Sequence, residues 1–123
     1  MKRKVMIVDD DRELLCELEE ILGASGYDIT AIDNTESVLN AVLQNHPDVI
    51  LMDLKMPGKS GFELADEISR VSTLNNIPVI AMSAFFRDDF KSLMQLCGIK
   101  KYLKKPFLVS DAISAIEGLV PRK

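Results

Sequence analysis

Acidic residues follow two of the short apolar runs in this sequence. Asp9 to Asp11 follow the first run, and Asp53 follows a later one. A hydroxyl group, that of Ser83, and an amine, that of Lys105, follow two further apolar runs. If the apolar runs are parallel strands, all of these side chains converge on one crevice beyond the carboxyl ends of the strands.

Several carboxylates in one crevice raise each other's pKa, and they need a cation to balance their charge. Oxygen ligands with room for water suit Mg²⁺ better than a transition metal. A lysine and a hydroxyl at the rim can bind the remaining oxygens of a phosphoryl group. A carboxylate held beside the metal is a competent nucleophile for making an aspartyl-phosphate. The residues alone therefore predict a magnesium-dependent phosphoryl acceptor.

Short apolar runs alternate along the chain with longer stretches whose apolar residues recur at helical spacing. The apolar runs cover residues 5–8, 27–32, 49–52, 78–82 and 102–103. The helical stretches cover residues 14–22, 38–42, 64–71, 90–94 and 109–120. Five strands alternating with five helices predict an α/β fold, in which helices cover both faces of a parallel sheet.

The composition of the runs predicts their order in the sheet. The first, third and fourth runs are apolar throughout and should be central, whereas the second and fifth carry polar residues, as edge strands do. These positions match the strand order 2-1-3-4-5 of a doubly wound, flavodoxin-like sheet. In that order the crevice lies beyond strands one, three and four.

The chain has 123 residues, of which 47% are hydrophobic and 28% charged, and this fits one soluble domain with a real core. A formal net charge of −4 argues against nucleic acid as a direct partner. No apolar run approaches the roughly 18 residues that a membrane span needs, so we expect a cytoplasmic protein without a membrane segment. Cys16 and Cys97 match no ligand spacing and are interpreted as reduced thiols at apolar positions.

Four short motifs, VDDD, DLKMPGKSGFEL, MSA and KPF, occur in this order between Val8 and Phe107. Their order and spacing resemble the receiver domain of two-component response regulators, of the chemotaxis-regulator type. Each motif alone is weak evidence, but four in register on the expected strands are highly specific. The resemblance covers about residues 4–119, so we expect a single receiver domain over residues 1–123 with no output domain present, either as a stand-alone regulator or as part of a longer chain.

The resemblance implies which residues form the metal site. Asp53 is expected to accept the phosphoryl group and to bind Mg²⁺. Asp10 is expected to bind the metal directly, and Asp9 is expected to assist through a water molecule. The backbone carbonyl of Lys55 would supply a further ligand.

The remaining motifs imply a group of residues that bind the phosphoryl group and switch. Ser83 occupies the position of the serine or threonine that bonds the phosphoryl group, and Lys105 would pair with another phosphoryl oxygen. The bond from Lys105 to Pro106 is commonly cis in this family. Ala84 is small enough to let Ser83 move, and Tyr102 occupies the position of an aromatic residue that changes rotamer.

The resemblance also implies partners and an output. The phosphoryl group would come from the phosphohistidine of a histidine kinase or of a phosphotransfer protein. Phosphorylation would then switch the surface formed by the fourth helix, the fifth strand and the fifth helix, and this surface would control a partner, an output domain or a dimer. Such a chain promotes its own phosphorylation and dephosphorylation, but it is not a dedicated enzyme.

Other charged residues near these motifs are expected to have structural roles. Asp11 precedes the first helix and should cap it. Side chains alternate along a strand, and the position before the proline indicates that Lys105 faces the crevice while Lys104 faces solvent. Asp88 and Asp89 should open the fourth helix, where its dipole favours acids.

Other classes of protein fit the sequence less well. A haloacid-dehalogenase-type phosphatase needs a second acid two residues after the nucleophile, where this chain has Lys55. The G-x-x-x-x-G-K-[ST] motif of P-loop nucleotide hydrolases is absent, and the first loop of a flavodoxin would not tolerate three acids. The alternative that stays open is a pseudo-receiver that binds a partner independently of phosphorylation, although such a chain would normally have lost its acids and its lysine.

Overall fold

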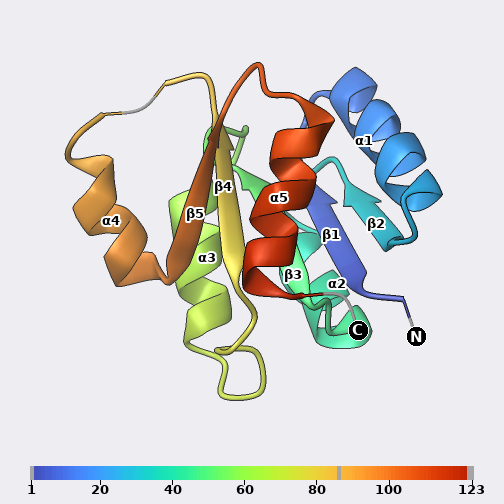
Figure 1. The fold of residues 1–123 in the computed structure, drawn as a ribbon. Coiled ribbons are helices and arrows are strands. Elements are labelled where there is room, and N and C mark those ends of the chain that lie inside the picture. The colour runs from blue at the N-terminus through green and yellow to red at the C-terminus, as the bar shows by residue number, and fades with distance from the viewer. Residues whose placement is uncertain (1, 86, 122–123) are drawn as a thin grey trace.

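The strands of the computed structural model form one parallel sheet (Figure 1). The structure describes residues 2–85 and 87–121. Within these ranges the strands are β1 (Lys4–Val8), β2 (Asp28–Ile32), β3 (Val49–Asp53), β4 (Val79–Ser83) and β5 (Ile99–Lys104). They lie in the order β2-β1-β3-β4-β5, so the predicted flavodoxin-like α/β order is confirmed.

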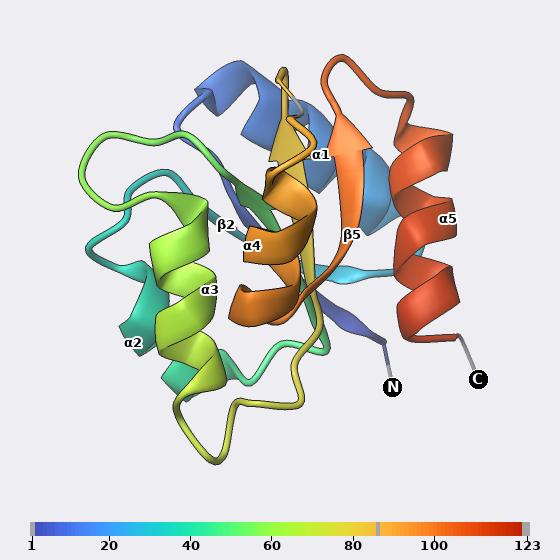
Figure 2. The same cartoon turned by 90° about the vertical axis from the view of Figure 1, so that its left-hand side faces the viewer.

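Helices cover both faces of the sheet (Figure 2). They are α1 (Arg12–Ala24), α2 (Val38–Asn45), α3 (Gly61–Ser69), α4 (Phe90–Cys97) and α5 (Val109–Leu119). α1 and α5 pack on one face, whereas α2, α3 and α4 pack on the other. Four of the helices are the crossover connections that parallel strands require. In the described part of the chain, no helix has the length and apolar character needed to cross a membrane.

The alternation of side chains along β1 builds a core on each face of the sheet. Val5 and Ile7 point to the face covered by α1 and α5, whereas Met6 and Val8 point to the opposite face. All four side chains are buried, as is every residue of β3 and β4. Strands that are buried on both faces form continuous apolar runs, and for this reason composition predicts correctly which strands are central.

The fifth strand is longer than the sequence predicts. It begins at Ile99 rather than at Tyr102, and Ile99 pairs with Val79 of β4. An irregularity follows this pair, because Ile80, the next residue of β4, pairs with Lys101. Lysines interrupt the apolar pattern of this edge strand, so the pattern indicates only its end.

The acids before α1 and before α4 behave differently. Asp11 accepts hydrogen bonds from the backbone N–H groups of Glu13 and Leu14, at 3.1 and 3.3 Å, and the predicted cap of α1 is confirmed. Asp89 directly precedes α4, but its side chain makes no capping bond and pairs instead with Arg87 at 3.1 Å. The start of α4 is therefore less firmly fixed by its own cap than the start of α1.

We expect Asp11→Ala to lower the free energy of unfolding by about 1 kcal/mol, because two N–H groups at the start of α1 lose their acceptor. Urea denaturation measures this loss. Glu17→Ala, at an exposed position within the same helix, is the matched control and should change the free energy of unfolding by less than about 0.5 kcal/mol. Equal stability of the two variants would contradict the role of Asp11 as a cap.

Candidate functional site

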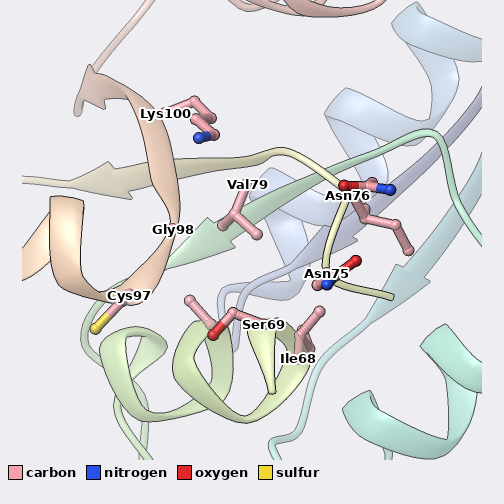
Figure 3. Close-up of a pocket in the computed structure, with 10 residues that line it drawn as sticks. Ile68, Ser69, Asn75, Asn76, Val79, Cys97, Gly98 and Lys100 are labelled. Atoms are coloured by element: carbon pink, nitrogen blue, oxygen red, sulfur yellow. The ribbon is translucent and has the colours of Figure 1, made fainter. Parts of the chain in front are cut away.

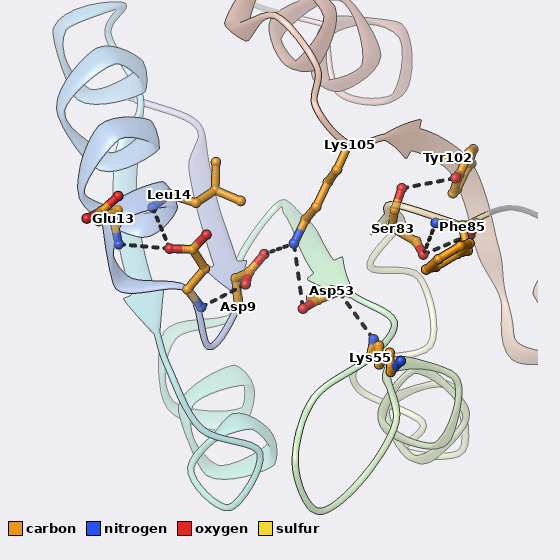
Figure 4. Close-up of polar contacts among 10 residues, drawn as sticks. Asp9, Glu13, Leu14, Asp53, Lys55, Ser83, Phe85, Tyr102 and Lys105 are labelled. Carbon is orange, nitrogen blue, oxygen red and sulfur yellow. Dashed lines mark hydrogen bonds and ion pairs between the residues drawn. The ribbon is translucent and has the colours of Figure 1, made fainter.

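The carboxyl ends of β1, β3 and β5 bring the predicted site residues together at one end of the sheet (Figure 4). Asp9 and Asp10 follow β1, Asp53 is the last residue of β3, and Lys105 follows β5. One carboxylate oxygen from each of the three acids lies within 4.8 Å of the others. The fold thus brings together side chains up to 96 positions apart in the sequence, those of Asp9 and Lys105.

The Lys105 side chain neutralises part of this acidic cluster. Its Nζ atom lies 2.6 Å from Oδ2 of Asp9 and 3.6 Å from Oδ2 of Asp53. Asp9 is fully buried and Asp53 is 6% exposed, and buried carboxylates without a partner would be costly. Lys104 is exposed, and the peptide bond from Lys105 to Pro106 is cis. The structure therefore confirms that Lys105, and not Lys104, faces the crevice.

Burial raises the pKa of the Asp53 carboxyl group above its ordinary value, and the nearby acids Asp9 and Asp10 raise this pKa further. The backbone N–H of Lys55, which donates to Oδ1 of Asp53 at 3.2 Å, and the Lys105 ammonium group oppose the rise. The fold therefore compensates the negative charge of Asp53 only in part. Such a carboxylate is stabilised by any cation that enters the crevice.

The donor atoms of the cluster fit a hard divalent cation. All three acids offer carboxylate oxygens, which are the ligands that Mg²⁺ prefers. Asp9 is buried, whereas Asp10 is exposed, so an ion held between them would keep one side open to water and to a further ligand. Mg²⁺ usually keeps several waters in protein sites. The assignment of the Lys55 backbone carbonyl as a further ligand stays a prediction.

The Ser83 hydroxyl group is engaged within its own loop. It donates to the carbonyl oxygen of Phe85 at 2.8 Å and accepts from the Phe85 N–H at 3.1 Å (Figure 4). The Ser83 carbonyl oxygen accepts bonds from the Tyr102 hydroxyl at 3.0 Å and from the Lys105 N–H at 2.8 Å. Ser83 thus contacts the two predicted site residues at β5, while its neighbour Ala84 is exposed.

A close backbone contact between Gly61 and Asp53 was not predicted from the sequence. A Cβ atom on Gly61 would lie 2.4 Å from the carbonyl oxygen of Asp53, and the Gly61 N–H donates to the carbonyl oxygen of Leu54 at 3.1 Å. Only glycine permits this approach of the start of α3 to the end of β3. The signal in the sequence is a glycine directly after the helix-capping residue Ser60, where glycine costs helix stability.

A pocket at the opposite end of the sheet is separate from this site (Figure 3). Its volume is 160 Å³, and its lining includes Ser69, Asn75, Val79, Cys97 and Lys100. These residues belong to the end of α3 and to the beginnings of β4 and β5 or the segments beside them. None of the predicted site residues lines this pocket, so it takes no part in the chemistry of the acidic cluster.

The chain belongs to the family of response regulator receiver domains, because the model of that family matches residues 5–117. Receiver domains are signalling domains rather than dedicated enzymes, and they generally bind Mg²⁺ at an acidic pocket. In this chain the acidic pocket contains Asp9, Asp10 and Asp53.

Individual relatives agree with this assignment. The chain is 37% identical to the transcriptional regulatory protein PdtaR of Mycobacterium tuberculosis over 122 residues, which cover 98% of this chain and 58% of PdtaR. It is 32% identical to the polar-differentiation response regulator DivK of Brucella ovis over 117 residues, which cover 95% of each chain. The chain therefore spans little more than half the length of PdtaR but nearly all of DivK.

Solved structures agree with the observed fold. The chemotaxis protein CheY4 of Vibrio cholerae matches this structure with a TM-score of 0.93 at 22% sequence identity, over 98% of this chain and 100% of CheY4. A putative response regulator from Chloroflexus aurantiacus matches with a TM-score of 0.90 at 24% identity, over 99% of this chain and 100% of that protein. The fold is thus the CheY-like form of the flavodoxin-like sheet.

We expect Asp53→Asn to raise the melting temperature of the metal-free protein at neutral pH. The folded state raises the pKa of Asp53, so the charged carboxylate opposes folding and an uncharged amide removes that cost. The cost is present above the folded-state pKa and is lost as the pH falls below the pKa of the unfolded chain, so the two proteins should converge in stability near about pH 4.

Thermal denaturation in the presence of EDTA, at several pH values, measures this difference. Asp28→Asn, which replaces an exposed carboxylate on β2, is the matched control and should leave the melting temperature nearly unchanged. A lower melting temperature of Asp53→Asn at neutral pH would show that Lys105 more than compensates the charge of Asp53, contrary to this prediction.

Proposed function

We propose that Asp53 accepts a phosphoryl group from a phosphohistidine in a magnesium-dependent reaction. The observation that carries this proposal is a carboxylate, 6% exposed, between acids that can hold a metal ion and a lysine that can hold a phosphoryl oxygen. A carboxylate oxygen of Asp53 attacks the phosphorus atom of the donor. The new O–P bond forms while the bond from phosphorus to the histidine nitrogen breaks, and the leaving nitrogen takes up a proton.

Asp10 and Asp53, together with the backbone carbonyl of Lys55, would hold the metal ion directly, and Asp9 would hold it through a water molecule. When bound, the ion supplies charge that offsets both the carboxylates and the phosphoryl oxygens. The chain itself contributes a rigid arrangement, because Asp53 ends a fully buried strand and Asp9 directly follows another strand of the sheet's centre. The acids therefore need little reorganisation before the reaction.

Lys105 and Ser83 would bind the phosphoryl oxygens that the metal leaves free. The Nζ atom of Lys105 already lies 3.6 Å from Asp53, so a phosphoryl group on that carboxylate falls within its reach. The Ser83 hydroxyl must first give up its hydrogen bond to the Phe85 carbonyl, and the small Ala84 leaves room for this movement. Because the Ser83 carbonyl accepts a bond from Tyr102, a shift of Ser83 changes the surroundings of that ring.

The donor would be a histidine kinase or a phosphotransfer protein, and the chain would therefore work in the cytoplasm, where such donors carry their phosphohistidine. A hollow of 360 Å³ lies beside the site, between the start of α1 and the turn after β5. Leu14, Lys105 and Phe107 are among the residues that line it. This hollow offers a donor side chain an approach that leads past Lys105 towards Asp53.

The surface formed by α4, β5 and α5 would carry the output of one receiver unit, residues 4–119. Lys100 and Lys104 are exposed there, and Leu93 and Leu96 of α4 are 40% and 78% exposed. Basic and apolar groups together suit an acidic protein partner, an output domain or a second copy of the chain. Tyr102 lies on β5 within this surface. Because its hydroxyl group donates to the Ser83 carbonyl oxygen, the position of its ring would change with the position of Ser83.

We expect incubation with Mg²⁺ and a small phosphodonor to add one phosphoryl group to the chain. Intact mass spectrometry after incubation with acetyl phosphate, and separately with phosphoramidate, measures the gain. Asp53→Asn should abolish it, because the nucleophilic oxygen is replaced, and so should EDTA. Asp11→Ala is the matched control and should still gain mass, because the Asp11 backbone N–H that donates to Asp9 at 2.9 Å is retained.

Failure of the folded wild-type chain to gain mass from both donors would contradict the proposal. It would favour the pseudo-receiver, which binds its partner independently of phosphorylation. A gain that persists in Asp53→Asn would contradict the assignment of Asp53 as the acceptor, since another side chain would then carry the phosphoryl group.

We expect Tyr102→Ala to be phosphorylated normally but to transmit less of the change to β5. The variant loses the hydrogen bond from Tyr102 to the Ser83 carbonyl, whereas the acids and Lys105 keep their positions. The measurement is the change in amide NMR shifts of residues 99–104 on phosphorylation. Lys104→Ala, which alters an exposed side chain of the same strand, is the control. Loss of phosphorylation itself in Tyr102→Ala would contradict this separation of roles.

A further inference from the structure

α4 is the most loosely packed of the helices that the structure describes. It has no buried residue, whereas each of the other four has at least two. A helix of eight residues is too short to be stable in isolation, so its order depends on its packing. The side chains that pack against the core are Phe90, Met94 and Cys97, all only partly buried. Figures 1 and 2 show α4 beside α3 and β5, away from the centre of the sheet.

Phe90, the first residue of α4, is contacted from two other segments. Its ring packs edge-to-face against Phe62, with the ring centroids 5.3 Å apart and the ring planes at 71°. The guanidinium carbon of Arg87 lies 5.9 Å from the centroid of the same ring. Phe62 is the second residue of α3, and Arg87 belongs to the segment between β4 and α4. Phe90 therefore lies where the connections that follow β3 and β4 meet.

Phe62 is held close to Asp53 through its neighbour Gly61, whose backbone packs tightly against the Asp53 backbone. It follows Gly61, at which a Cβ atom would lie 2.4 Å from the Asp53 carbonyl oxygen. The Gly61 N–H also donates to the Leu54 carbonyl oxygen at 3.1 Å. The start of α3 is thus held directly against the backbone of Asp53, and a shift of that backbone must move Phe62 with it.

We propose that the Phe62–Phe90 pair couples the β3–α3 loop, residues 54–60, to the position of α4. Packed interfaces of this kind change between discrete arrangements rather than deforming smoothly, so a small shift at the loop alters the seating of α4. This route starts from the β3–α3 loop and reaches α4 through the ring pair, whereas the proposed route through Ser83 and Tyr102 reaches β5. The coupling is a property of the unmodified chain, and only its use by phosphorylation rests on the proposed function.

Amide hydrogen exchange of the unphosphorylated protein, measured by NMR, tests the coupling. Phe62→Leu and Phe90→Leu each keep an apolar side chain but remove one ring of the pair. Each variant should speed exchange in α4 by roughly two- to tenfold, the factor that an aromatic pair contributes beyond burial. Phe90→Leu should also speed exchange in the loop of residues 54–60, although position 90 is distant from this loop in the sequence. The double variant should exchange no faster than the single variants, because the two rings act as one unit.

Leu96→Ala is the matched control, because Leu96 lies on the same helix with its side chain 78% exposed. It should leave exchange in the loop of residues 54–60 unchanged. The proposal is overturned if Phe90→Leu also leaves that loop unchanged, or if the effects of the two single variants simply add.

A second experiment measures hydrogen exchange of the same amides after phosphorylation. Intact mass spectrometry verifies that the phosphoryl group is present. Protection of α4 should change in the wild type and in Tyr102→Ala, and the change should be reduced in Phe90→Leu. An equal change in Phe90→Leu would refute this route from Asp53. If the wild type gains no phosphoryl group, the proposed function fails, while exchange in the unphosphorylated variants still decides whether the pair couples the loop to α4.

Discussion

The charge balance between Lys105 and the acids Asp9 and Asp53 is the interaction on which the rest of the site depends. A fully buried carboxylate and a nearly buried one lie close together, and the ammonium group within 2.6 Å of one and 3.6 Å of the other compensates them only in part. The remaining negative charge favours a cation in the crevice. In the proposed function, the same partial compensation would leave an Asp53 oxygen free to attack phosphorus, because a complete ion pair would engage its oxygens.

The order of the strands makes this balance possible. The three groups lie at the carboxyl ends of β1, β3 and β5, and the order β2-β1-β3-β4-β5 brings the ends of these strands to one crevice. The strands that carry the acids are buried on both faces, so side chains at their ends are held by the core rather than by flexible loops. Gly61 adds a further constraint, since it lets α3 begin directly against the backbone of Asp53.

The sequence predicts the parts of this arrangement that depend on periodicity and on strand ends. Continuous apolar runs identify the central strands, and the residue after each run identifies Asp9, Asp53 and Ser83. The sequence could not predict contacts that depend on three-dimensional packing. The engagement of Ser83 by the backbone of Phe85 depends on the path of a loop, which no periodicity encodes. The early start of β5 was hidden by its lysines, which interrupt the apolar pattern of an edge strand.

The packing of Phe62 against Phe90 could not be predicted for the same reason. This pair offers a way for a change at a site held by buried strands to reach the surface of the molecule. Coupling between two sites in a protein is usually worth about 1–3 kcal/mol. Fully burying one large apolar side chain is worth about 1.5–3 kcal/mol, so moving β3, in which every residue is buried, would cost far more than the coupling supplies. α4 has no buried residue, and its seating depends on a few partly buried side chains. In the proposed coupling, a change at Asp53 would therefore alter the position of α4 while the strands that hold the acids stay in place.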